Sequence, residues 1–350
     1  MTDYLGAAYP AIAAKLPKLD IASLPTPVSH HLIATGTANH DVFVKQDDLT
    51  SPLYGGNKVR KLEYLLRRAM DRGATRVATF GAAGSNHALA TALFAHELGL
   101  DCTCFLAGQK PTPTIVPTLN RYLQLGTELV RYGRGVDHVR LFRRYIQNRN
   151  TWVIPLGGTC WLGAVGFVNA GLELAAQIAA GEFEAPQRIY LANGTMGSVA
   201  GLSIGLTLAG HDTEIHAVRV ADNAMTRPEA LHSLIAKTLQ LLRRIEPAIP
   251  AETDPHKIIH WRDEFYAGGY AAVDDATRSA VCRADDEMEL KLETTYTGKA
   301  MTALLHDMQT QPANGPVLFW NTYNSTPLAT DSAVPEDLSP IPEAFHSYYH

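Results

Sequence analysis

Hydrophobic residues follow two alternating spacings along most of this chain. Short apolar runs, such as residues 77–80, are typical of buried strands, and stretches with apolar residues three and four positions apart follow them. In the stretch 58–72, Leu62, Leu65 and Leu66 fall on one face of a helix. Strands that alternate with helices in this way predict βαβ units on a parallel sheet, and therefore an α/β protein.

The alternation continues to about residue 320. We predict strands at 41–49, 77–80, 102–107, 127–132, 152–156, 188–192, 214–220 and 317–320. We predict helices at 58–72, 86–98, 114–125, 135–148, 164–180, 198–209, 226–246, 274–289 and 298–310. With 350 residues, the chain is longer than a single domain usually is, so we expect two lobes that share a cleft.

Three polar loops follow predicted apolar strands, where open parallel sheets bind ligands. In the loop 81–87, Ser85 can cap the next helix, whose free N–H groups favour an anion such as a carboxylate; by itself, this loop is more typical of a simple helix cap. The loop 193–201 places glycines and hydroxyls at a helix start and suits a phosphate, although it is neither a Walker loop nor a dinucleotide loop. The loop 320–326 could face a heteroaromatic ring nitrogen with its hydroxyls.

Lys58 stands at the start of a predicted helix, where a single lysine is normally a solvated residue. Here, however, it follows Gly55, Gly56 and Asn57, and such a turn allows the backbone to approach a ligand closely. A lysine amine held at this point can form a Schiff base with an aldehyde cofactor. Lys58 is therefore the first candidate for a chemical role.

Composition excludes several classes of protein. The net charge of −5 argues against a nucleic-acid partner, and no uninterrupted apolar run is long enough to predict a membrane span. The N-terminal segment lacks the features of a secretion signal, so we expect a cytoplasmic location. No metal site is predicted, because His96-Glu97 lacks the second histidine of a zinc-protease helix. Four scattered cysteines predict core thiols in a reducing compartment: Cys102, Cys104, Cys160 and Cys282.

A reactive lysine, an anion loop and a phosphate loop are the parts that a pyridoxal 5'-phosphate (PLP) site needs. Their order resembles that of tryptophan synthase β-like (fold type II) PLP enzymes. More specifically, the chain resembles the D-cysteine desulfhydrase and 1-aminocyclopropane-1-carboxylate deaminase family from about Leu24 to Thr322. The segments that resemble this family are KQDDLT (45–50), GGNKVRKLEYLL (55–66), GAAGSNHALATALFAHELGL (81–100), LGGTCWLGAVGF (156–167), ANGTMGSVAGL (192–202) and TYTGKAMTALL (295–305).

The resemblance implies a two-domain fold in which each domain is a mostly parallel twisted sheet flanked by helices. Residues 1–53 plus 158–350 would form a large PLP-binding domain, and residues 54–157 a small domain. A homodimer and a small amino-acid substrate are implied as well.

The resemblance also implies roles for individual residues. Lys58 would hold the cofactor as a Schiff base and later remove the substrate Cα proton, while Asn86 would hydrogen-bond the cofactor's phenolate oxygen. Tyr270 would lie against the cofactor, and Tyr296 beside the reacting carbon. The phosphate would be held by Gly194, Thr195, Met196, Gly197 and Ser198, with Lys61 one turn beyond Lys58. Substrate would be bound by Ser85, Asn86, His87 and Tyr323.

One position helps to choose the reaction. Thr297 stands where the cyclopropane deaminases have a glutamate that keeps the pyridine nitrogen protonated. With a neutral hydroxyl there, and Thr322 as a further hydroxyl partner, the ring is a shallower electron sink. This favours loss of a β-substituent, as in a D-cysteine desulfhydrase, over ring opening.

Other functions stay open at this point. A cyclopropane deaminase is disfavoured by Thr297, whereas a β-replacement synthase is compatible with the same residues. The Tyr323-Asn324 pair, where the family has two glycines, predicts an altered substrate pocket and leaves room for a PLP-binding or ligand-sensing protein with degenerate chemistry. That last class is disfavoured by the residues that are retained: Lys58, Ser85, Asn86 and Tyr296.

Overall fold

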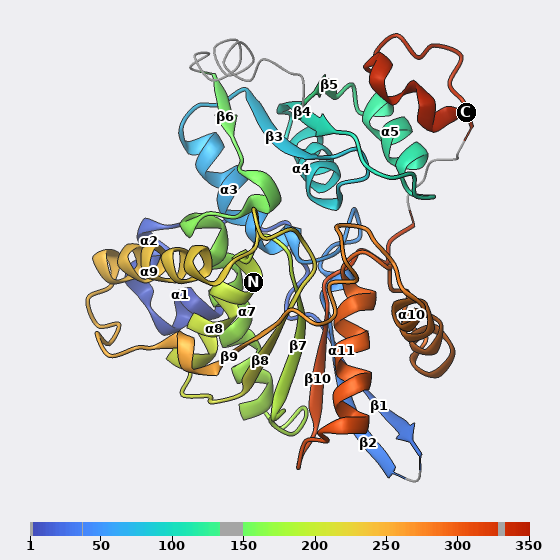
Figure 1. Cartoon of the computed structure of the whole chain (residues 1–350). Coiled ribbons are helices and arrows are strands. Elements are labelled where there is room, and N and C mark those ends of the chain that lie inside the picture. Colours follow the sequence, from blue (N-terminus) through green and yellow to red (C-terminus); the bar gives the residue numbers. More distant parts are fainter. Residues whose placement is uncertain (1–2, 37, 134–149, 328–332) are drawn as a thin grey trace.

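The computed structural model describes residues 3–36, 38–133, 150–327 and 333–350 and contains two β-sheets (Figure 1). The larger sheet has the strand order β1-β2-β10-β7-β8-β9, and the smaller has the order β5-β4-β3-β6. Every neighbouring pair is parallel except the β1–β2 hairpin. The predicted α/β class with mostly parallel sheets is confirmed.

The strands of the larger sheet are β1 (Val28–Thr35), β2 (Ala38–Gln46), β7 (Arg188–Asn193), β8 (Glu214–Arg219), β9 (Ile259–Arg262) and β10 (Val317–Asn321). Those of the smaller sheet are β3 (Arg76–Ala82), β4 (Asp101–Ala107), β5 (Glu128–Arg131) and β6 (Thr151–Val153). The described helices are α1 (Tyr4–Ala8), α2 (Pro10–Lys15), α3 (Lys58–Asp71), α4 (Asn86–Glu97), α5 (Ile115–Gln124), α7 (Trp161–Ala179), α8 (Gly197–Leu208), α9 (Pro228–Ile245), α10 (Asp275–Met288) and α11 (Thr297–Thr310). Four short 3-10 helices complete the set: η1 (Asp47–Leu49), η2 (Leu156–Gly158), η3 (Pro255–Ile258) and η4 (Glu343–Tyr349).

Helices cover both faces of the larger sheet. Along β7, Ile189 and Leu191 belong to a core cluster shared with α7, α8 and α9, while Tyr190 and Ala192 belong to a second cluster shared with α10 and α11. Successive side chains of a strand point to opposite faces, so a strand covered on both sides reads as a continuous apolar run. This is why the sequence 189–192 has no polar face.

Helix α7 packs in the core cluster on one face of the larger sheet. By length and composition it could cross a membrane, but 72% of its most apolar window is buried inside the protein, as in the core helix of a folded domain. Small residues allow α8 to approach it closely: a Cβ added to Gly171 would lie 2.9 Å from the Cα of Gly205. The apolarity of α7 is therefore explained by its packing.

Several predicted elements differ from the observed ones. The strand predicted at 41–49 ends at Gln46, because Asp47 and Asp48 turn into η1 and are buried. Neither β1 nor β9 was predicted, since their side chains are mostly half-buried or exposed and lack a clear apolar alternation. The helix predicted at 135–148 lies outside the described residues. Of the four predicted core thiols, Cys102 and Cys104 are buried, but Cys160 is half-buried and Cys282 is exposed on α10.

The two sheets correspond to different parts of the chain. Strands β3 to β6 lie within the predicted small domain and the other strands outside it, but the boundaries at 53/54 and 157/158 stay a prediction. The C-terminal η4 lies beside α5, next to the smaller sheet (Figure 1). There the Tyr349 hydroxyl donates to Asn120 Oδ1 on α5, and the Tyr348 hydroxyl bonds the backbone of Gln109.

Candidate active site

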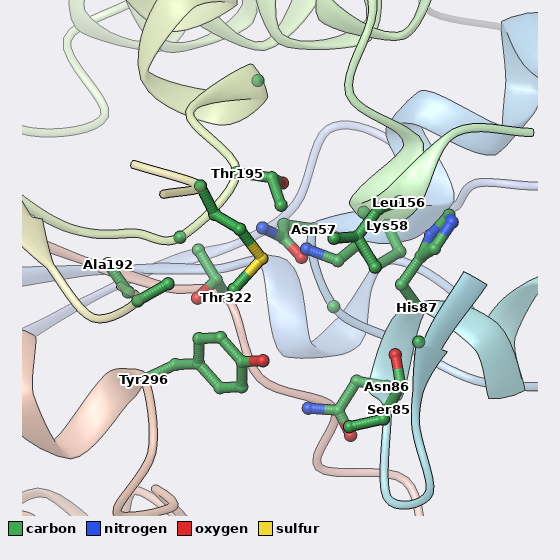
Figure 2. Close-up of a pocket in the computed structure, with 18 of the residues that line it drawn as sticks. Asn57, Lys58, Ser85, Asn86, His87, Leu156, Ala192, Thr195, Tyr296 and Thr322 are labelled. Atoms are coloured by element: carbon green, nitrogen blue, oxygen red, sulfur yellow. The ribbon is translucent and has the colours of Figure 1, made fainter. Parts of the chain in front are cut away.

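A cavity of about 790 Å³ lies between the larger sheet and the smaller sheet, with residues from both around it. It is lined by all three loops that the sequence singled out, at the carboxyl ends of β3, β7 and β10. Figure 2 shows side chains from these loops, among them Asn86, Thr195 and Thr322, around the same space as Lys58, together with Tyr296 from the start of α11. All the predicted site residues line this cavity. Among the described residues, no group of three or more histidines, cysteines or carboxylates could hold a metal ion.

Lys58 is the first residue of α3 and is half-buried in the cavity wall. Its Nζ has neither a hydrogen bond nor an ion pair with any residue within the described ranges. Burial lowers the pKa of Lys58 to about 8. A larger share of this amine is therefore uncharged near neutral pH than at an exposed lysine, as both Schiff-base chemistry and proton removal require.

The turn before Lys58 is clamped by distant residues. Gly55 N–H donates to Asn324 Oδ1 (2.7 Å), and Asn57 N–H donates to the carbonyl of Thr322 (3.2 Å). Gly56 has φ +94° and faces the Thr322 carbonyl, so a side chain there would be strained. From the sequence, Asn324 was expected only to alter the substrate pocket. In the structure its side-chain amide also holds the turn that precedes Lys58.

Lys61 lies one turn further along α3 and is 1% exposed. Its Nζ donates to the Gly157 carbonyl (3.3 Å) and has no carboxylate partner in the described part of the chain. Burial and the nearby charge of Lys58 lower the pKa of Lys61 well below its ordinary value. A Cβ added to Gly197 would lie 2.9 Å from this Nζ, so the ammonium directly faces the predicted phosphate loop.

The predicted phosphate loop, residues 194–198, opens α8. Thr159 Oγ1 donates to Thr195 Oγ1 (2.7 Å), Asn57 Nδ2 donates to Ser198 Oγ (3.1 Å), and Thr226 donates to the Gly194 carbonyl. Met196 adopts φ +67°, a left-handed backbone conformation. The free N–H groups at the start of α8 and the Lys61 ammonium together suit a dianion.

The predicted anion loop has the expected helix cap, since Ser85 Oγ accepts a hydrogen bond from Ala88 N–H (3.3 Å) at the start of α4. Asn86 Oδ1 accepts one from the Tyr54 hydroxyl (3.2 Å). His87 is 3% exposed, and its Nε2 accepts from Gly158 N–H (3.1 Å). Burial and the charges of Lys58 and Lys61 lower the pKa of His87 well below 6.5, so it is neutral and holds the Gly157-Gly158 turn beside Lys61.

Two predicted tyrosines meet at the other side of the cavity. The Tyr270 and Tyr296 hydroxyls are 2.6 Å apart and hydrogen-bonded. Burial raises the pKa of both, most strongly that of Tyr296, and the charge of Glu293 raises both further. Both hydroxyls therefore stay protonated at any working pH of the protein.

Glu293 was not predicted, and it explains the environment of Thr297. Its Oε1 accepts the N–H groups of Tyr296 and Thr297 (both 2.8 Å), and its Oε2 accepts that of Thr295 (2.7 Å). The Thr297 hydroxyl lies 3.2 Å from the same carboxylate. A carboxylate at a helix start is a recognisable capping pattern, E-x-x-x-T here, although the sequence does not reveal that it also lines the cavity.

Comparison with known proteins agrees with this geometry. Residues 20–322 match the family model described as pyridoxal-phosphate dependent enzyme. The chain belongs to this family. Its cofactor is PLP, and the residues around the cavity fit that group, because Lys61 is a buried amine with no carboxylate partner among the residues that the structure describes, beside an N-terminal helix cradle.

Individual relatives are similar along most of their length. D-cysteine desulfhydrase from Salmonella choleraesuis (strain SC-B67) is 32% identical over 325 residues, which cover 88% of this chain and 94% of the relative. The enzyme of the same name from Salmonella newport (strain SL254) is also 32% identical, with the same coverage. A solved structure described as an ACC deaminase homologue has a TM-score of 0.74 at 28% identity and covers 93% of this chain and 96% of its own. A fungal L-serine ammonia-lyase from Rhizomucor miehei has a TM-score of 0.60 at 18% identity, covers 87% of this chain and 95% of its own, and shows the shared fold alone.

Proposed function

We propose that this PLP-dependent lyase removes the β-substituent of a small amino acid, with D-cysteine as the substrate and pyruvate, sulfide and ammonia as the products. The observation that supports this choice is Thr297, whose hydroxyl is engaged by Glu293 and which offers no carboxylate of its own to a ring nitrogen. The similarity to curated D-cysteine desulfhydrases supports it independently.

The chain's own residues support each step of such an elimination. When bound, the cofactor supplies an electron sink for the bond electrons at the substrate Cα. The Lys58 amine, with its pKa of about 8, takes the Cα proton. Ser85 and the first N–H groups of α4 hold the substrate carboxylate, and this fixes the orientation of the Cα–H bond.

The hydroxyl pair of Tyr270 and Tyr296 can donate one hydrogen bond toward the departing sulfur. One proton of the pair is used between the two oxygens, and the other is free to point into the cavity. Elimination breaks the Cα–H and Cβ–S bonds and releases hydrosulfide. Water then converts the remaining enamine to pyruvate and ammonia.

Ring opening of 1-aminocyclopropane-1-carboxylate is the second candidate, because the solved ACC deaminase homologue covers nearly the whole chain. Its product is 2-oxobutanoate, so the two reactions are distinguished chemically. A β-replacement synthase would instead consume a second nucleophile and release no pyruvate.

The test is an absorbance and product assay on the purified protein reconstituted with PLP. It is titrated with D- and L-cysteine, D- and L-serine and 1-aminocyclopropane-1-carboxylate. Sulfide and pyruvate in equal amounts from D-cysteine support the proposal. Production of 2-oxobutanoate would replace it with the deaminase, and turnover only after a thiol or other nucleophile is added would replace it with the synthase.

We also propose a cytoplasmic homodimer, without a nucleic-acid or membrane partner. The net charge of −5 and the burial of the apolar α7 support the absence of nucleic-acid and membrane partners, and the family resemblance supports the homodimer. Light scattering of the purified protein at several concentrations tests the dimer, since a monomer mass throughout would contradict it.

A further inference from the structure

Lys299 is a buried cation that the proposed reaction does not use. It belongs to the first turn of α11, three residues after Tyr296, and is 0% exposed. Its Nζ donates to the carbonyls of Tyr266 (2.7 Å) and Gly269 (3.1 Å), and it has no carboxylate within ion-pair distance among the described residues. Lysine is almost never buried without a counterion, because losing its hydration is costly. Burial lowers the pKa of Lys299 to about 8, although the charges of Asp274, Glu293 and Asp222 act in the opposite direction.

The two carbonyls belong to a loop with an unfavourable backbone. Between β9 and α10, Ala267 has φ +58°, Gly268 φ +77° and Ala271 φ +56°. A left-handed conformation costs a non-glycine residue about 1 kcal/mol or more, so such a loop keeps this shape only where its surroundings hold it. The Tyr266 and Gly269 carbonyls flank the first two of these positions and converge on one ammonium.

The Tyr266 side chain anchors the same loop from a second direction. The Arg219 guanidinium lies 4.0 Å from the centre of its ring, and Lys299 Nζ lies 5.2 Å from it. The Tyr266 hydroxyl donates to Asp222, which lines the cavity, and Arg219 pairs with Asp263 at the start of the loop. The loop is therefore attached to β8 and to α11 at once.

Tyr270 follows Gly269 directly and reaches the cavity from this loop. Its hydroxyl is the hydrogen-bond partner of Tyr296 (2.6 Å), which immediately precedes α11. Lys299 thus connects the helix that carries one tyrosine to the loop that carries the other. We propose that Lys299 is a positioning residue that holds the Tyr270 loop so that the Tyr270 and Tyr296 hydroxyls meet in the active site.

This inference rests on the proposed function only in assigning the tyrosine pair to the reaction. The decisive experiment is a double-mutant cycle with Lys299→Met and Tyr270→Phe in the PLP-loaded full-length chain. It is measured on whichever amino acid the unmodified protein turns over. A substrate other than D-cysteine would therefore overturn the substrate assignment without affecting the cycle.

If Lys299 acts through Tyr270, each single variant lowers kcat by about tenfold or more, with a much smaller change in KM. The double variant then has the same kcat as Tyr270→Phe within about twofold. Lys291→Met is the control, because this exposed lysine pairs with Asp285 and lies outside the cavity lining; it should leave kcat unchanged. Multiplying effects in the double variant, or an unchanged kcat in Lys299→Met, would overturn the proposal.

Hydrogen exchange of the cofactor-free protein supplies a readout that does not depend on activity. Lys299→Met should increase amide exchange in residues 263–272 while α8 and β7 keep their protection. Lys299→Gln retains one donor and should give a smaller increase, and it carries the same cycle if Lys299→Met does not fold. If both variants lose the folded, PLP-binding state, Lys299 stabilises the whole fold and the proposal fails.

Discussion

Helix α3 presents cations to two very different surroundings. Arg60 points into a cluster with Lys45, Asp47 and Glu173, which we call the Arg60 cluster, whereas Lys58 and Lys61 face the cavity. Residues 58 and 61 are three positions apart and share a face, while residue 60 lies on another. Within a single turn, α3 therefore faces a structural ion cluster on one side and, on another, the site that binds an anionic cofactor.

The difference lies in the counterions. Arg60 donates to both Asp47 oxygens (2.9 and 2.7 Å) and to both Glu173 oxygens (3.0 and 2.8 Å), and Lys45 donates to Glu173 (2.6 Å). In the described part of the chain, Lys61 has one hydrogen bond, to the Gly157 carbonyl at 3.3 Å, and its Nζ lies 5.9 Å from the centre of the Phe167 ring. Buried charges are tolerated when they are paired, so an unpaired one that also faces a cavity, as Lys61 does, indicates that a ligand completes the site. The comparison predicts opposite consequences for substitutions on the two faces of α3.

The largest expected effect is a loss of turnover when Lys58 is replaced, on the face of α3 that borders the cavity. Lys58→Ala should lower turnover by about 10³-fold or more and abolish the absorbance band of the lysine-bound cofactor, because both the Schiff base and the proton acceptor are lost. The protein should remain folded, since Lys58 pairs with none of the described residues. Absorbance spectra and product assays test this, with Lys291→Met as the control. Substantial turnover with the normal band in Lys58→Ala would contradict the site.

Arg60→Met should have the largest effect on stability. It leaves Asp47 and Glu173 buried with Lys45 as their remaining cation, and we expect a loss of about 3–5 kcal/mol in the free energy of unfolding. Arg67→Met is a matched control on the same helix, because Arg67 pairs with Asp71 on the surface and should cost less than about 1 kcal/mol. Urea unfolding of the cofactor-free proteins gives both values. Equal losses in the two variants would show that the Arg60 cluster is no more important than a surface ion pair.

Acid should act on the Arg60 cluster specifically. Burial by itself raises the pKa of Glu173, but the charges and hydrogen bonds of Arg60 and Lys45 outweigh it and lower the pKa to about 2. A carboxyl with a folded pKa below its unfolded value near 4.5 stabilises the fold above that value. The contribution, about 3 kcal/mol, disappears as the pH falls from about 4.5 to about 2.

The measurement is the free energy of unfolding between pH 7 and pH 3 for the unmodified protein and Arg60→Met. In the variant the pKa of Glu173 should be higher, so the difference between the two curves should shrink as the pH decreases. A difference that stays constant down to pH 3 would contradict this assignment of the cluster's charge.

Lys61→Met should separate cofactor binding from stability. The affinity for PLP should fall about 10–100-fold, because a charge-assisted contact to the phosphate is lost. The cofactor-free protein should become slightly more stable, since a buried amine that has no carboxylate partner among the described residues is removed. Fluorescence titration with PLP and urea unfolding test the two signs, and a loss of cofactor-free stability would mean that Lys61 is part of the structural cluster.

The sequence predicts one side of this comparison much better than the other. Lys58 and the three loops were recognised because their glycines, hydroxyls and position after apolar strands are local features. The Arg60 cluster was missed, since Glu173 is 113 residues from Arg60 and only folding brings them together. The same holds for Asn324, whose amide clamps Gly55 from 269 residues away, and for Lys299. Periodicity predicts helices and buried strands, but it does not tell which buried charge has a counterion.

The smallest effect is expected at Met196, in the phosphate loop before α8. It tests whether this part of the cavity wall also holds backbone strain. Its φ of +67° favours glycine, yet the side chain is only 7% exposed and packs in the main core cluster. Met196→Ala removes this packing and keeps the strain, whereas Met196→Gly removes both. Glycine should therefore be more stable than alanine here by about 1 kcal/mol, the reverse of their order in a helix. The matched pair is Met301→Ala and Met301→Gly within α11, where alanine should be the more stable by a similar amount. If alanine were more stable at both positions, the Met196 backbone would not be strained. The phosphate loop would then hold no more backbone strain than a regular helix such as α11.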